Sequence, residues 1–69
     1  MQGTVKWFNT LKGYGFITPA HGGDDVFFHV SALKPLGLTE ISEGQRIEYE
    51  LTMSHDNRLK ACDLQLRSA

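Results

Sequence analysis

Two short aromatic stretches, residues 12–17 and 26–30, constrain the fold of this chain more than any other feature. Alternate residues of an extended strand share one face of a sheet. In the first stretch this alternation puts Lys12, Tyr14 and Phe16 on one side and leaves two glycines and an isoleucine on the other. Because glycine has no side chain, we expect the strand to bend there and another backbone to approach closely, as happens where small barrels close.

The second stretch divides in the same way. Phe27 and His29 share one face, while the apolar residues Val26, Phe28 and Val30 share the other and form a natural core set. If the two strands are neighbours, their rings and the lysine make one aromatic, partly basic surface. Such a surface is typical of proteins that stack nucleic-acid bases.

Burial in a core is the alternative explanation for these rings, because aromatic residues favour buried strand positions. A domain of this size buries only about 60% of the surface of its chain, and other apolar side chains suffice to fill one small core. These candidate core residues are Val5, Ile17, Val26, Phe28, Val30, Leu33, Ile47, Leu51, Leu64 and Leu66. We therefore expect the remaining rings to lie outside the core.

Short strands separated by turn residues account for most of the sequence, without sustained helical periodicity. We expect five strands, over residues 3–9, 14–18, 25–29, 45–52 and 58–66. Residues 31–44 are expected to be irregular, with a single helical turn after Ser31. Closure into a barrel removes the exposed edges of a small sheet. The predicted fold class is all-β, a five-stranded antiparallel barrel, in a single domain that spans residues 1–69.

Net charge argues against a purely electrostatic nucleic-acid binder, because the formal charge is −1 and the pI is near 6.2. Residues 1–23, however, contain Lys6 and Lys12 and no acid, so positive charge accompanies the aromatic motif. We expect stacking to contribute more affinity than phosphate neutralisation, and binding to weaken only gently with salt.

Other classes of protein find little support. A single cysteine, Cys62, excludes an internal disulfide and favours a reducing compartment, and we expect it to be a small core residue. No signal peptide or membrane-spanning stretch is evident, so we expect a cytoplasmic protein. His21, His29, His55 and Cys62 match no known ligand or nucleophile spacing. We expect no enzyme, cofactor, metal or small-molecule substrate.

The order of four motifs resembles the bacterial cold-shock protein family over essentially the whole chain. The motifs are GTVKWFN at residues 3–9, KGYGFI at 12–17, DVFFH at 25–29 and EGQ at 43–45. This resemblance implies a barrel of the oligonucleotide-binding (OB) type that binds single-stranded RNA and DNA and acts as an ATP-independent RNA chaperone. A monomer is the expected state, with a strand-swapped dimer as the alternative.

The resemblance also implies a ligand face. Its residues would be Lys6, Trp7, Lys12, Tyr14, Phe16, Asp25, Phe27 and His29, with Asn9 and Lys60 at the margin. Asn9 and Asp25 are either base contacts or turn residues, and Arg58 is either a phosphate contact or a solvated side chain. Alternation leaves open whether Trp7 or Phe8 faces outward, because adjacent rings cannot share a face; the family pattern puts Trp7 toward the ligand.

Four positions depart from the family pattern. Tyr14 replaces a phenylalanine and Phe28 replaces a valine, whereas Val30 and Leu38 stand where the family usually or often has phenylalanine. At about 1–3 kcal/mol per stacked base, the loss of one or two rings predicts binding weaker by about tenfold to several hundredfold than in a fully equipped relative.

Two other binding modules fit parts of the sequence. An RNA recognition motif shares the Lys-Gly-Tyr-Gly-Phe opening, but it needs two helices and its second motif precedes the first. A small barrel that docks proline-rich peptides on exposed rings is the other alternative, and such a groove does not need lysines between the rings.

Overall fold

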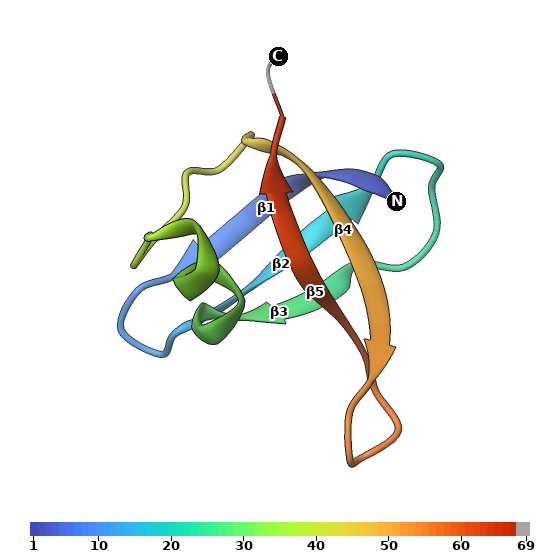
Figure 1. The fold of residues 1–69 in the computed structure, drawn as a ribbon. Helices are drawn as coiled ribbons and strands as arrows, with labels where there is room; N and C mark the ends of the chain where they lie inside the picture. The colour runs from blue at the N-terminus through green and yellow to red at the C-terminus, as the bar shows by residue number, and fades with distance from the viewer. Residues whose placement is uncertain (68–69) are drawn as a thin grey trace.

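The computed structural model describes residues 1–67 (Figure 1). The elements follow in the order β1 (Gln2–Asn9), β2 (Tyr14–Pro19), β3 (Val26–His29), the 3-10 helix η1 (Val30–Leu36), β4 (Arg46–Met53) and β5 (Leu59–Leu66). The strands close into a barrel in the order β1-β2-β3-β5-β4, and η1 packs against β5 and β3. The predicted all-β, five-stranded barrel of the OB type is therefore confirmed.

Barrel closure differs from the expectation in one respect. Neighbouring strands are antiparallel except for β3 and β5, which run parallel and pair at Phe27 and Lys60. Figure 1 shows β4 and β5 crossing over β1, β2 and β3. Within residues 1–67, no helix is long and apolar enough to cross a membrane.

The expected strand boundaries agree with the observed ones to within one residue, but the helix is longer than expected. Seven residues form η1, which begins at Val30 rather than after Ser31. Its start is capped by His29, whose side chain accepts a hydrogen bond from the Ser31 backbone N–H. Its end is set by Gly37 in the left-handed conformation, with φ at 74°, which glycine adopts without strain.

The core comprises the buried side chains of Val5, Ile17, Val26, Phe28, Leu33, Ile47, Tyr49, Ala61 and Leu64. Two other expected core residues, Val30 and Leu51, are half-buried and pack against this cluster. Leu66 was expected inside, but it is the last residue of β5 and is 49% exposed. That expectation is wrong, because Leu66 lies at the end of its strand, where the side chains of residues 1–67 leave about half of it uncovered.

A bulge in β5 changes which of its residues face the core. Asp63 has φ at 51°, in the left-handed region, and Asp63 and Leu64 together oppose Tyr49 on β4. Ala61 and Leu64 are therefore both buried although they are three residues apart. Cys62 is only half-buried, so the expectation of a core cysteine is wrong.

Tyr49 fills the barrel interior and is fully buried. Its hydroxyl is also buried and has no hydrogen-bond partner among the described residues. Leaving a buried hydroxyl unpaired costs about 1–3 kcal/mol. The same burial raises the pKa of the Tyr49 hydroxyl, because the interior disfavours the charged phenolate.

Replacing Tyr49 by phenylalanine is expected to raise the free energy of unfolding by about 1 kcal/mol at neutral pH, because it removes the unpaired hydroxyl and keeps the ring. Urea titration of the two proteins measures the difference. A less stable Phe variant would show that the hydroxyl has a partner in solution.

The unmodified protein and the Tyr49→Phe variant should also differ in how their free energy of unfolding changes in alkaline solution. The ordinary pKa of 10.0 applies to Tyr49 in the unfolded chain, and the folded value lies above it. As the pH rises past 10.0, the unfolded chain loses this proton first and is stabilised. The contribution of the Tyr49 proton to the free energy of unfolding is fully present below the pKa of Tyr49 in the unfolded chain. It is lost as the pH rises through the pKa of Tyr49 in the folded chain. The Tyr49→Phe variant is expected to lack that fall when urea titrations are repeated across this range.

Candidate functional site

A bulge in β1 determines which of its two adjacent rings reaches the surface. The pairing of β1 with β2 shifts between Val5 and Trp7, so Lys6 has no partner on β2. Phe8 turns toward the core and stacks on Phe28, with the ring centroids 5.6 Å apart and the planes at 18°. Trp7 therefore lies on the outer side, as the family pattern implied.

Four half-buried rings form a continuous surface over β1, β2 and β3, which we call the aromatic face: Trp7, Tyr14, Phe16 and Phe27. The Trp7 centroid lies 5.6 Å from that of Tyr14 and 5.2 Å from that of Phe16. The Phe27 centroid lies 5.7 Å from Tyr14 and 5.9 Å from Phe16. These tilted and edge-to-face contacts are favourable and hold the rings in place. Each ring still leaves part of its surface open.

Gly15 allows this face to lie directly over the core. A Cβ atom at this position would overlap the carbonyl oxygen of Trp7 and would lie 3.0 Å from the ring of Phe28. The close approach of another backbone that the glycine predicted is thus confirmed.

The lysines expected to contact a ligand lie around the aromatic face. The Lys6 Nζ donates to Asp25 Oδ2 at 2.8 Å, and the two side chains are 53% and 35% exposed. Lys12 is exposed in the turn before β2, and Lys60 is the partner of Phe27 across the β3–β5 pair. An ion pair this exposed contributes about 1 kcal/mol or less, so Lys6 can exchange Asp25 for another anion.

The side chains of Asn9 and His29 both accept hydrogen bonds from nearby backbone N–H groups. The Asn9 Oδ1 accepts a hydrogen bond from the backbone N–H of Lys12 at 3.0 Å, which matches the turn reading of this residue. The His29 Nδ1 accepts from the Ser31 N–H at 3.2 Å. In this tautomer the proton lies on Nε2. The exposed imidazole adjoins Tyr14, its partner across β2 and β3.

A groove of about 360 Å³ extends from the aromatic face to the β4–β5 hairpin. It is lined by Phe27, His29, Ser31, Ser54, Asp56, Arg58 and Lys60. Arg58 Nε lies 3.5 Å from Asp56 Oδ2, and both side chains are mostly exposed. A hydrogen bond from the Ser54 hydroxyl is the main cause that lowers the pKa of Asp56. Sequence reasoning missed Ser31 and Ser54, because nothing in the chain distinguishes them from ordinary loop serines.

The two positions that lack the family's phenylalanine present little flat surface. Val30 belongs to η1 and Leu38 follows it, and both are half-buried against the core cluster.

The described residues offer neither a cluster of metal ligands nor an activated thiol. Residues 1–67 contain no group of three His, Cys, Asp or Glu side chains close enough to hold a metal ion. Burial, followed by the nearby charges of Asp63 and Glu50, raises the pKa of the Cys62 thiol. A raised pKa disfavours the thiolate, which is the nucleophilic form.

Comparison with known proteins identifies one family. The model of the "'Cold-shock' DNA-binding domain" family matches residues 1–67. The probable cold shock protein y4cH of Sinorhizobium fredii is 50% identical over 61 residues, which are 88% of each chain. The cold shock-like protein CspE of Escherichia coli is 54% identical over 52 residues, 75% of each chain. Glycine-rich protein 2 of Nicotiana sylvestris is 46% identical over 63 residues, but this match spans only 29% of that longer protein.

Replacing Gly15 by alanine is expected to lower the free energy of unfolding by about 3 kcal/mol, because the added methyl overlaps backbone and presses on the core. Urea denaturation followed by Trp7 fluorescence measures this. Gly37→Ala is the matched control, since a methyl there meets nothing within 4 Å but must adopt φ at 74°. The control is expected to cost about 1 kcal/mol from backbone strain alone. Equal losses in the two variants would mean that the barrel wall has room at Gly15.

Proposed function

This chain belongs to the cold-shock domain family, and on that premise we propose that its aromatic face binds single-stranded RNA and DNA by stacking successive bases. The family match supports nucleic-acid binding in general. The preference for single strands is supported by one observation: four partly open rings lie with centroids 5.2 to 6.3 Å apart on one surface. Every base has a flat face, so such binding tolerates many sequences.

Preference for open strands follows from base stacking. Bases in a duplex already stack on one another and cannot meet the rings of the protein. A protein that binds the open form shifts a hairpin toward its unfolded state by mass action. This is sufficient for an RNA chaperone without ATP, and a cytoplasmic monomer could perform it because the aromatic face lies within one chain.

The cations and polar residues would hold the strand in place. Lys12 and Lys60 flank the rings and would contact phosphates, and Lys6 would do so after leaving Asp25. Arg58 lies in the groove beside Phe27, where a phosphate could displace its weak contact with Asp56. His29 would stack on a base beyond Tyr14. Asn9 would act indirectly, by fixing the turn that carries Lys12.

We also propose that this chain binds single strands more weakly than a family member with phenylalanine at the positions of Val30 and Leu38. The aliphatic side chains of Val30 and Leu38 are half-buried and cannot stack on bases as rings do. Each missing stacked base would cost about 1–3 kcal/mol of binding free energy.

Trp7 fluorescence tests this function directly. We expect quenching by hexathymidine, and none by a matching duplex or a proline-rich peptide. Phe27→Ala is expected to raise the Kd for hexathymidine by about tenfold, through the loss of one stacking ring. Met53→Ala is the matched control, because Met53 is an apolar side chain that is 57% exposed on β4, outside the aromatic face. A response to the peptide alone would instead favour peptide docking.

A second variant tests whether Asp25 contacts a base or only neutralises Lys6. If this carboxylate mainly neutralises Lys6, Asp25→Asn is expected to tighten hexathymidine binding about threefold at low salt. The slope of log Kd against log salt should steepen by about 0.7, the value for one further phosphate contact on a single strand. Asp24→Asn removes the same charge from a neighbour that makes no ion pair within residues 1–67. Weaker binding of Asp25→Asn would assign Asp25 to a base contact.

A further inference from the structure

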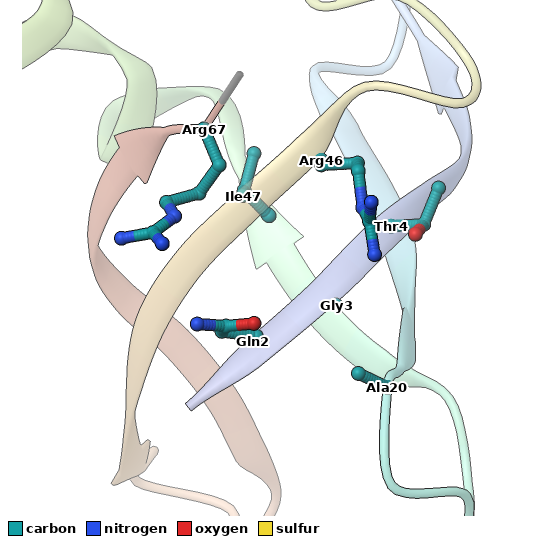
Figure 2. A pocket seen from close by; sticks show the side chains of 7 residues that line it. All are labelled: Gln2, Gly3, Thr4, Ala20, Arg46, Ile47 and Arg67. Atoms are coloured by element: carbon teal, nitrogen blue, oxygen red, sulfur yellow. The ribbon is translucent and has the colours of Figure 1, made fainter. Parts of the chain in front are cut away.

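A small polar pocket lies on the barrel wall where β1 meets β4, outside the aromatic face (Figure 2). Its volume is about 140 Å³, and its polar side chains are Gln2, Thr4, Arg46 and Arg67. This space is large enough for one phosphate group but too small for a nucleobase with its sugar. The base-stacking mechanism does not use it.

Every polar side chain that lines this pocket within residues 1–67 can donate a hydrogen bond, and none of them is a carboxylate. The pocket gathers two of the three arginines of a chain whose net charge is −1. Arg46 makes no ion pair within residues 1–67. Arg67 donates from Nη1 to Glu48 Oε1 at 3.1 Å, which leaves donors on its other guanidinium nitrogens. Donors without a matching acceptor indicate an anion site.

The backbone fixes the two arginines side by side. The Arg67 N–H donates to the Arg46 carbonyl at 2.8 Å. The Gln45 side-chain amide donates to the carbonyls of both arginines, at 2.8 Å and 3.1 Å. In Figure 2 the Arg46 side chain lies on one side of β4 beside Thr4, and the Arg67 side chain lies on the other. The backbones of the two arginines are thus held together, and their long side chains must turn toward each other for both guanidinium groups to bind one oxyanion.

The pocket adjoins the aromatic face through β1. Thr4 and Lys6 both project from the outer side of this strand, whereas Gly3 and Val5 are buried. Lys6 is followed directly by Trp7 of the aromatic face. Trp7 is the third residue after Thr4, a distance of about 10 Å along a strand. A nucleic-acid strand that leaves the rings past Lys6 would therefore meet this pocket next.

We propose that Arg46 and Arg67, with Gln2 and Thr4, bind a backbone phosphate of the same single strand as it leaves the aromatic face. The inference rests on the proposed function and extends the footprint of the protein beyond the stacked bases. It also gives longer strands a source of affinity that does not depend on the rings missing at Val30 and Leu38.

The test compares two strand lengths on the intact protein. The variant Arg46→Gln/Arg67→Gln is expected to bind hexathymidine, which covers only the aromatic face and the cations beside it, with unchanged Kd. Its Kd for dodecathymidine is expected to rise about fivefold at low salt, and the slope of log Kd against log salt for that ligand to fall by about 0.7. The Lys34→Gln variant is the matched control, because it removes an exposed cation from η1, outside both sites. An unchanged Kd for hexathymidine also shows that the double variant is folded.

Three results would overturn the inference. The first is an equal effect of the double substitution on both strand lengths, and the second is a loss in Lys34→Gln as large as in the double variant. The third is saturable binding of inorganic phosphate, seen at the arginine side-chain resonances, with no dependence on strand length, since that would mark a site for free anions. Failure of the unmodified protein to bind hexathymidine would instead overturn the proposed function itself.

Discussion

The barrel wall is a single layer of backbone, and this constraint governs most of the structure. Each strand residue faces either the core or the surface, so neighbours in sequence face opposite ways except at the bulges in β1 and β5. Phe27 is half exposed among the surface rings, whereas Phe28 is fully buried beneath them. The thin wall depends on Gly15, where any side chain would overlap the adjacent strand. On both β1 and β3, a surface ring and a core-facing ring are consequently adjacent in sequence.

Charge on this protein is arranged locally rather than as a broad basic field. The Lys6–Asp25, Arg58–Asp56 and Arg67–Glu48 pairs each set a cation against a carboxylate at or near a proposed contact. Exposed pairs of this kind are weak, so they can be exchanged for phosphate at little cost. In a chain with net charge −1, this arrangement limits nonspecific attraction while leaving cations available beside the rings.

Sequence pattern was sufficient for the parts of the fold that obey simple alternation. The strand boundaries follow from the turn residues between strands, and the division of residues 26–29 between core and surface follows from a period of two. Alternation could not predict the two bulges, because the residue types at Lys6 and Asp63 do not indicate a register shift. The family resemblance oriented Trp7 correctly. Alternation placed Leu66 wrongly, and the expectation that Cys62 lies in the core as a small apolar residue was also wrong. The length of η1 depends on a cap from His29, a residue that alternation had assigned only to the surface.

The parallel pairing of β3 with β5 has a consequence for how the chain folds. Phe27 and Lys60 meet only when segments distant in sequence come together, and closing so long a loop costs entropy before the contact stabilises anything. The hairpin-linked strands β1, β2 and β3 involve shorter closures and can gather the four rings without β5. The groove beside Phe27, however, needs residues from the β4–β5 hairpin. The aromatic face together with this groove is therefore expected to be complete only late in folding. Slow barrel closure would then limit how soon a newly made chain could bind a nucleic-acid strand along the whole of the proposed surface.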